Sequence, residues 1–328
     1  MSAQDIASAP RQRRVAAIDC GTNSIRLLIS EVDPATGAVS EISRRNTIVR
    51  LGQGVDETGR FQPEAIERAR EALGEYVSEM EREGVTRLRM VATSATRDAA
   101  NREDFFAMTR GVLGRIQPGA QAEVISGDEE AALSYVGATA DLEPGRGPAL
   151  VIDLGGGSTE FVMSMDGRVR ARSTQMGCVR VTERFMRTDP PTASETENAR
   201  AYIRERIAEA AADVPFERAS TFVGCAGTFT TLSALAQGLP SYEPARIHMS
   251  EIPFTRMREV TAELRRKTAA QRLEDPVIHP GRADVIASGA TVVEEMMGAF
   301  EAAANAISFV ISEKDILDGI VAGLASVD

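Results

Sequence analysis

Two short segments repeat one arrangement of residues that could bind phosphate and a metal ion. Ile18-Asp19-x-Gly21-x-x-Ser24 recurs as Ile152-Asp153-x-Gly155-x-x-Ser158. Glycine lets the backbone approach a ligand closely, and successive N–H groups in such a loop form a concavity that binds an anion. The aspartate that ends the strand before each loop stands where a divalent cation or an attacking water could be held. A hairpin that uses glycine only for its geometry would explain one such loop more readily than two.

Neither loop matches a common nucleotide motif. A Walker loop needs G-x-x-x-x-G-K-[ST], and the sequence contains no such segment. A Rossmann fingerprint places a helix directly after its glycines, whereas the residues after both loops have the pattern of strands. The two copies stand too far apart for a solenoid repeat. They predict two similar domains that each open with a strand, a glycine-rich loop and a second strand.

The hydrophobic pattern predicts the elements that must hold these loops. Strands and helices follow one another in the same order twice, which is typical of α/β layers. We expect a flexible tail over 1–13, a first domain over 14–138 and a second over 139–312, with a closing helix at about 313–328 that returns to the first domain. Strands are expected at 15–19, 25–30, 39–49, 87–92, 122–125, 150–153, 160–164, 220–223 and 306–310, and helices at 62–83, from about 127 to 136, at 194–212, from 230, at 289–304 and at 315–324.

Composition narrows the class of protein. The 48 Asp and Glu outnumber the 37 Lys and Arg, giving a net charge of −11, which argues against a general nucleic-acid binder. The chain has two histidines and three cysteines without a C-x-x-C pair, so a multi-histidine centre or a zinc finger is not expected. No apolar run is long enough to span a membrane, and the first residues lack the apolar stretch of a secretory signal. We therefore expect a cytoplasmic enzyme with no nucleic-acid or membrane partner.

Several motifs, in order and spacing, resemble the exopolyphosphatase and guanosine pentaphosphate phosphohydrolase (Ppx/GppA) family over about residues 15–324. The resemblance implies two actin-like domains (ribonuclease H-like, ASKHA superfamily) with a cleft between them. The chain is most similar to the short actinobacterial form, which lacks the C-terminal histidine–aspartate domain. One departure is Asp315-Ile-Leu-Asp318-Gly319, where many relatives have an arginine and a glutamate before the glycine. The matching segments are IDCGTNSIRLLI, VATSATRD, ISGDEEA, VIDLGGGSTE, MGCVRVTE, VGCAGT and SEKDILDGI.

The resemblance assigns roles to the carboxylates. In ISGDEEA, Glu130 would be the catalytic base that deprotonates the attacking water, although its place at a helix start would by itself suggest only a favourable helix-dipole interaction. Glu129 would face outward. Asp153 and Glu160 are similar to the family's ligands of Mg²⁺ (or Mn²⁺), a metal that favours carboxylates, phosphate oxygens and water.

The predicted phosphate contacts come from three glycine-rich turns and one arginine. Arg97 resembles a family arginine that faces the phosphate chain, and Arg44, Arg45 and Arg180 could extend a basic track. Gly227 belongs to a turn before a helix, whose free N–H groups would suit an anion. A strand-to-helix turn with Thr228 as its cap would explain Gly227 equally well. The other predicted contacts are Asn23, Gly156, Gly157, Ser158 and Thr159.

The implied function is an exopolyphosphatase that cuts inorganic polyphosphate from its end and releases orthophosphate. A guanosine pentaphosphate (pppGpp) 5′-phosphohydrolase would use the same machinery, and nothing in the sequence separates the two. An actin-like sugar or carboxylate kinase, or a polyphosphate or nucleotide sensor without turnover, are further alternatives. The resemblance is also compatible with a homodimer.

Overall fold

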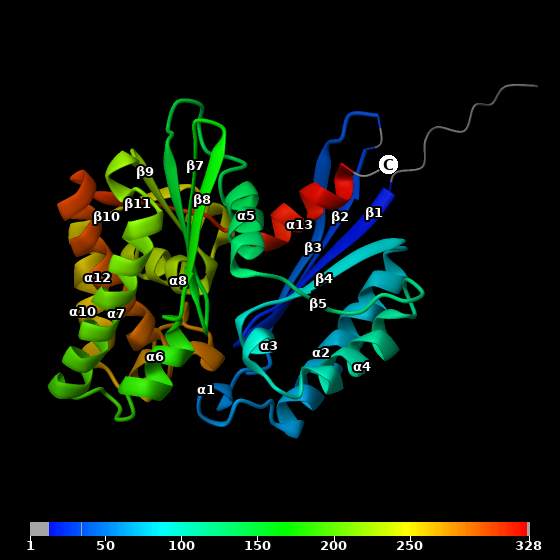
Figure 1. The fold of residues 1–328 in the computed structure, drawn as a ribbon, viewed down its shortest axis with the longest axis horizontal. Helices are drawn as coiled ribbons and strands as arrows, with labels where there is room; N and C mark the ends of the chain where they lie inside the picture. The colour runs from blue at the N-terminus through cyan, green and yellow to red at the C-terminus, as the bar shows by residue number, and fades with distance from the viewer. Residues whose placement is uncertain (1–12, 34, 327–328) are drawn as a thin grey trace, which may run out of the picture.

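The computed structural model describes residues 13–33 and 35–326. Two mixed β-sheets stand side by side, each with its own helices, and helices α5 and α13 lie between them (Figure 1). The first sheet has the strand order β3-β2-β1-β4-β5 and the second has β10-β11-β9-β6-β7-β8. The predicted N-terminal tail lies outside the described residues except for Arg13, where β1 begins.

The first sheet carries the first loop. Strand β1 pairs antiparallel with β2 and parallel with β4, and the loop joins β1 to β2. One face of helix α2 is apolar because Ala65, Leu73, Val77 and Met80 recur at helical spacing, and this face is buried. The elements are β1 (Arg13–Cys20), β2 (Ser24–Val32), β3 (Val39–Ile48), α1 (Val55–Thr58), α2 (Pro63–Arg82), β4 (Arg87–Ala92), α3 (Ser94–Asp98), α4 (Arg102–Leu113) and β5 (Glu123–Val124).

The second sheet repeats this topology. Strand β6 pairs antiparallel with β7 and parallel with β9, and the second loop joins β6 to β7. The repeat seen in the sequence is therefore a repeat of structure. The elements are β6 (Ala149–Leu154), β7 (Thr159–Met165), β8 (Arg168–Thr174), α6 (Cys178–Phe185), α7 (Ala193–Asp213), η1 (Phe216–Arg218), β9 (Thr221–Cys225), α8 (Ala226–Ala236), α9 (Pro244–Ile247), β10 (Ser250–Pro253), α10 (Phe254–Arg266), α11 (Ala269–Arg272), η2 (Pro280–Arg282), α12 (Ile286–Ala304) and β11 (Ser308–Ile311).

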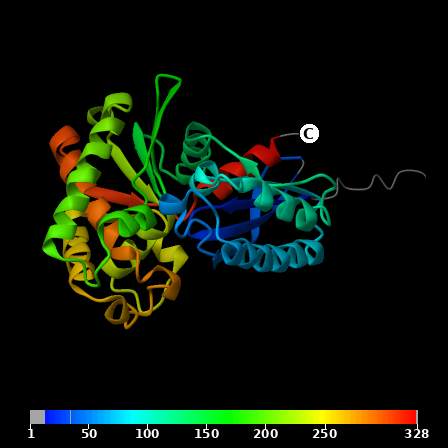
Figure 2. The same ribbon diagram turned by 60° about the horizontal axis from the view of Figure 1, so that its bottom comes forward.

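Two helices cross between the sheets and tie them together. Helix α13 (Ile316–Ala325) buries Ile316 and Ile320 against Val15 and Ala17 of the first sheet. Helix α5 (Gly127–Ala138), which follows the first sheet in the chain, packs instead on the second sheet through Ala131 and Ala138. The long helix α2 and the red helix α13 lie on opposite sides of the blue strands (Figure 2). The closing helix thus contacts the first sheet, while the exact domain bounds stay a prediction.

Most predicted elements are present within a few residues of their expected bounds, but two differ. Helix α8 begins at Ala226 rather than 230, so Gly227 lies in its first turn and not in a turn before it. The TSATRD segment forms the short helix α3 instead of an open turn. Strand β8 and helices α4, α6 and α10 were not indicated by the pattern.

In the described part of the chain no helix combines the length and the apolar character needed to cross a bilayer.

Candidate active site

The two loops meet at a cavity of about 940 Å³ between the two halves of the chain. Each loop closes with the same backbone hydrogen bond, from Gly21 N to Ser24 O at 3.0 Å and from Gly155 N to Ser158 O at 3.1 Å. Seven of the ten predicted site residues line the cavity, and the other three, Arg97, Thr159 and Glu160, lie outside its lining. The seven are Asn23, Glu130, Asp153, Gly156, Gly157, Ser158 and Gly227.

The second loop can pack on the first only because it contains glycine. A Cβ atom on Gly157 would lie 2.6 Å from Ser94 Oγ and 2.7 Å from Thr22 Oγ1, which is closer than real side chains come. Thr22 belongs to the first loop and Ser94 begins α3, so Gly157 lies between elements of the opposite half. Glycine at this position thus allows the second loop to lie in close contact with Thr22 and Ser94 of the other half.

A pair of carboxylates marks the second loop. Asp153 and Glu160 stand opposite each other in the β6–β7 register, and such residues share a face of the sheet. Ser134 donates to Asp153 at 2.5 Å, and Ser173 donates to Glu160 at 2.7 Å. Burial, together with the charge of Asp315, raises the pKa of Asp153 to about 6. Burial, together with the charge of Asp153, raises the pKa of Glu160 to about 7.

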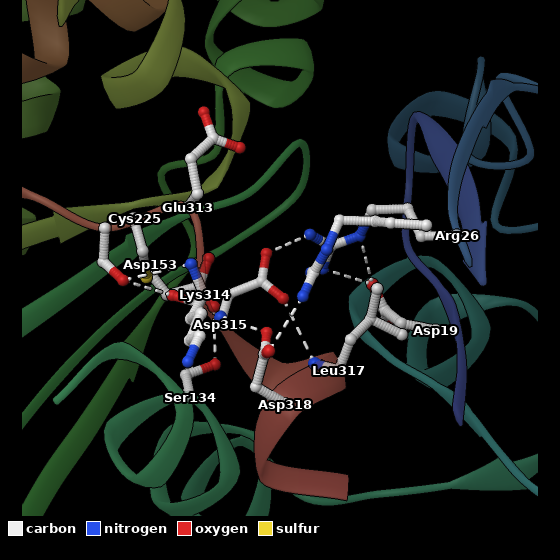
Figure 3. A network of polar contacts seen from close by, with 12 residues as sticks. Asp19, Arg26, Ser134, Asp153, Cys225, Glu313, Lys314, Asp315, Leu317 and Asp318 are labelled. Atoms are coloured by element: carbon white, nitrogen blue, oxygen red, sulfur yellow. Dashed lines mark hydrogen bonds and ion pairs between the residues drawn. The ribbon is translucent and has the colours of Figure 1, made fainter. Parts of the chain in front are cut away.

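The first loop has the same register with a different partner. Asp19 stands opposite Arg26, which occupies the position that Glu160 has in the second repeat. The Arg26 guanidinium donates to Asp19 Oδ2 at 2.6 Å from Nη2 and also pairs with Asp315 (Figure 3). The first aspartate is thus neutralised by the protein, whereas Asp153 and Glu160 form no ion pair with any described residue. The two repeats therefore differ in charge, because Arg26 stands in the first where Glu160 stands in the second.

Glu130 is a further carboxylate that lines the cavity. It lies in the first turn of α5, is 8% exposed, and accepts from Arg97 Nη1 at 2.7 Å. Burial and the neighbouring Glu160 raise the pKa of Glu130, and Arg97 opposes that rise. Arg97 also donates to the carbonyl of Ile125 at 3.0 Å, while its Nη2 is buried without a hydrogen-bond partner. Glu129 is exposed and pairs with Arg89, as expected of an outward-facing residue.

The third predicted glycine lies beneath an arginine that the sequence did not indicate. A Cβ atom on Gly227 would lie 1.6 Å from Nη1 of Arg282, so the guanidinium rests on the bare backbone at the start of α8. Arg282 and Tyr242 both line the cavity on this side. Arg44 and Arg45 of β3 also line the cavity. Arg180 does not line the cavity.

The residues present fit a divalent cation that binds together with its substrate. Asp19 Oδ1 is buried without a hydrogen-bond partner, and Asp153 presents a carboxylate to the same cavity. No group of three or more His, Cys, Asp or Glu among residues 13–33 and 35–326 forms a complete metal cage. Mg²⁺ commonly binds to one or two carboxylates and completes its shell with water and substrate phosphate. This donor set suits such a site and not a preformed structural metal.

The sequence analysis did not identify several residues that form ion pairs or hydrogen bonds around the candidate site. Arg26 was not among the predicted site residues, although its place in the repeat, equivalent to that of Glu160, was a usable signal. Asp315 caps α13 by accepting from Leu317 N at 3.1 Å. The same carboxylate also pairs with Arg26. Asp318 belongs to the closing segment that differs from the pattern of many relatives, and it pairs with Arg44 at 2.8 Å. Ser134 lies on a helix after the first sheet and gave no signal toward Asp153.

These buried carboxylates predict an unusual pH dependence of stability. Between about pH 4 and pH 7, folded Asp153 and Glu160 keep protons that the unfolded chain releases, so the metal-free protein loses stability as the pH rises. A pKa change of 1 is worth about 1.4 kcal/mol, which corresponds to a few degrees in melting temperature for a chain of this size. In EDTA, melting should therefore occur at least about 3 °C lower at pH 8 than at pH 5.5.

Added Mg²⁺ should raise the melting temperature more at pH 8 than at pH 5.5. A Glu160→Gln variant serves as the control, because it removes one of the buried carboxyl groups whose pKa is raised and should reduce both differences. Equal melting at the two pH values, with an equal effect of Mg²⁺, would contradict this account of the site.

Comparison with known proteins agrees with this geometry. A model described as the Ppx/GppA phosphatase family matches residues 28–323. The chain is 52% identical over 314 residues to Exopolyphosphatase 2 of Mycobacterium tuberculosis (strain ATCC 25618 / H37Rv), covering 95% of this chain and 98% of that protein. Two solved structures are also similar. A crystal structure of an exopolyphosphatase-like protein matches with a TM-score of 0.88 and 42% identity, covering 95% of this chain and 98% of that one.

The second is the Aquifex aeolicus member of the Ppx/GppA family, with a TM-score of 0.77 and 30% identity, covering 95% of this chain and 97% of that one. Both matches extend over nearly the whole length of the chain. The predicted fold class, α/β with two actin-like domains, is thereby confirmed.

Proposed function

The chain belongs to the Ppx/GppA phosphatase family, and from this membership we propose that it is an exopolyphosphatase that releases orthophosphate from the ends of inorganic polyphosphate. One observation carries the proposal. Both glycine-rich loops, the buried Glu130 and Asp153 line a single cavity in a chain that is 52% identical, almost end to end, to a protein named as an exopolyphosphatase. A phosphatase needs anion-binding N–H groups, a base and charge neutralisation in one place, and this cavity offers all three.

In the proposed mechanism the chain positions the terminal phosphate and activates water. N–H groups of the loop at Gly156, Gly157 and Ser158 bind phosphate oxygens and stabilise the charge that develops on them. Glu130 orients a water toward the terminal phosphorus and takes its proton. The bond between water oxygen and phosphorus forms as the bridging P–O bond breaks, and the shortened chain leaves with the bridging oxygen. Positioning and charge stabilisation supply most of the acceleration in phosphoryl transfer.

Asp153 and Glu160 would hold Mg²⁺ (or Mn²⁺) at the second loop. When bound, the metal would neutralise charge on the phosphate oxygens as a Lewis acid. The asymmetry of the repeats supports this placement, because Arg26 already neutralises the corresponding aspartate of the first loop. Asn23 and Gly227 complete the proposed phosphate contacts on the facing walls of the cavity.

Arginines in the cavity wall explain how an acidic protein could bind a polyanion. The net charge of −11 repels polyphosphate at long range, but salt screens that repulsion over about 8–10 Å. Arg282 lines the cavity without an ion pair to any described residue, while Arg44 and Arg45 line it as partners of Asp318 and Glu79 and could exchange these partners for phosphate. Hydrogen bonds from guanidinium groups to phosphate are short and strong. Local attraction thus outweighs distant repulsion once the chain end has entered.

A pppGpp phosphohydrolase is the second candidate, because its phosphates would meet the same loops. Rates of phosphate release from long-chain polyphosphate, pppGpp and ATP, measured side by side with purified protein and Mg²⁺, test the proposal. We expect the highest kcat/KM on polyphosphate. A clear preference for pppGpp would replace the proposed substrate, and binding without release from any of the three would overturn the enzymatic function.

Arg97→Ala is expected to slow the reaction at neutral pH. Arg97 pairs with Glu130 at 2.7 Å and opposes the rise in the pKa of that base, so its loss leaves more Glu130 protonated. We expect kcat at pH 7 to fall at least about tenfold and the acid limb of the kcat profile to move to higher pH. The pH profile of kcat on tripolyphosphate and on long chains is the measurement.

The two chain lengths separate the two roles considered for Arg97. An arginine that tunes the base affects both substrates equally, whereas one that binds distant phosphates raises KM mainly for long chains. If Arg97→Ala left the kinetics on both substrates unchanged, both roles would be excluded.

A further inference from the structure

Arg180 joins the second phosphate loop to the opposite half of the molecule. Its Nε donates to the carbonyl oxygen of Gly157 at 2.7 Å. Its Nη2 donates to Asp98 at 2.5 Å and lies 3.4 Å from Ser94 Oγ, and its Nη1 pairs with Asp56. Arg180 itself belongs to α6, behind the loop, and is 9% exposed. One buried guanidinium thus bonds to the second loop through Nε and reaches the opposite half through Nη1 and Nη2.

The partners of Arg180 belong to the elements that hold the proposed base. Asp98 and Ser94 stand at the two ends of α3, and the same helix carries Arg97, which pairs with Glu130. Gly157 lines the cavity, and its carbonyl oxygen accepts from Arg180. The guanidinium is planar and rigid, so it fixes the separation of the groups that it bridges. Arg180, helix α3 and Arg97 thus form a continuous series of contacts from the second loop to Glu130.

We propose that Arg180 is a positioning residue that sets the distance and orientation between the phosphate loop and the Arg97–Glu130 pair, without touching the substrate. The inference rests on the proposed hydrolase function. It replaces the expectation that Arg180 extends the basic track, because this side chain is buried outside the cavity and its charge is already paired with two carboxylates. In-line attack needs water, base and phosphorus aligned, and a misplacement of about 1 Å can cost about 10²-fold in rate.

Two substitutions distinguish positioning from phosphate binding. Arg180→Lys keeps the charge but cannot bridge Gly157, Asp98 and Asp56 together, so kcat should fall at least about tenfold while KM changes less than about threefold. The fall should be the same for tripolyphosphate and long-chain polyphosphate. Asp98→Asn removes one of the bridged carboxylates, so kcat should fall severalfold, with no gain in affinity.

A role in the track predicts the opposite pattern. Arg180→Lys would then leave kcat near the wild-type value and raise KM most for long chains. Asp98→Asn would lower KM, because it removes a negative charge that competes with phosphate for Arg180. Either result, or wild-type kinetics in both variants, overturns the positioning role.

Arg184→Gln provides the matched control. Arg184 pairs with the same Asp56, at 2.6 Å from Nη2, but its guanidinium makes no hydrogen bond to Gly157 or Asp98 among the described residues. Its kcat should stay within about twofold of the wild-type value. Should Arg180→Lys fail to fold in a thermal-unfolding measurement, the half-exposed Asp98 still permits the test through Asp98→Asn alone. Wild-type protein that releases no orthophosphate would instead show that the proposed function is wrong.

Discussion

Glu130→Gln is expected to lower kcat on polyphosphate by at least about 10²-fold, the range in which removal of a general base falls. Glutamine preserves the size of the side chain and can still accept from Arg97, but it cannot take a proton from water. Because Glu130 is assigned to the proton transfer and not to the binding of phosphate, KM should change little. Steady-state kinetics of orthophosphate release at saturating Mg²⁺ measures both parameters.

Glu129→Gln is the control for this substitution. Glu129 occupies the same helical turn, but it is exposed and pairs with Arg89 at 2.6 Å. Its loss should leave kcat within about twofold of the wild-type value, as is usual for exposed ion pairs. Near-native turnover in Glu130→Gln would remove Glu130 from the mechanism, and a selective loss in Glu129→Gln would assign the base to the neighbouring residue.

Removal of divalent cations is expected to abolish turnover. Asp153 and Glu160 are 6% and 1% exposed and form no ion pair with a described residue, so a cation at the second loop would balance the negative charge that they carry when ionised. Without a cation this charge repels the substrate phosphates, and no histidine cluster in the described chain could replace it. Activity in EDTA should fall to background and return on addition of Mg²⁺ or Mn²⁺.

A charge-neutralised variant sharpens the metal test. Glu160→Gln should need a higher Mg²⁺ concentration for half-maximal activity, while it keeps the fold and the base. Zn²⁺ should not be required, because the proposed ligands are oxygen atoms only. Full activity after exhaustive chelation, or an unchanged Mg²⁺ requirement in Glu160→Gln, would contradict the proposed site.

The fold followed from the sequence wherever local pattern and tertiary structure agree. The alternation of apolar residues located both strand–loop–strand units, and the repeated Asp-x-Gly-x-x-Ser pattern predicted that Asp19 and Asp153 would occupy equivalent places. Helix α8 was expected too late because its first residues, Ala226-Gly227-Thr228, look like a turn. Tertiary packing over Gly227 permits a helical start there, and the bare glycine accommodates Arg282.

The site was predictable in its loops but not in its ion pairs. Glycines and aspartates act through the local backbone, so their spacing carries the signal. The pairing of Arg180 with Gly157 and Asp98, and of Arg26 with Asp315, joins residues that are far apart in the chain. Nothing in a local window shows which of 35 arginines faces a carboxylate and which faces the substrate. Only the three-dimensional structure shows that Arg180 lies outside the cavity and bonds to the second loop.

The central claim is that water activated in this cleft attacks the terminal phosphorus of polyphosphate. Hydrolysis of tripolyphosphate in H₂¹⁸O with Mg²⁺, stopped after the first cleavage and followed by mass spectrometry of the orthophosphate released, tests it most directly. The account predicts one solvent oxygen in each orthophosphate, because the water oxygen joins the phosphorus that leaves. Orthophosphate without solvent oxygen would place the attack on the next phosphorus along the chain, and no release of orthophosphate would show that this protein does not hydrolyse polyphosphate.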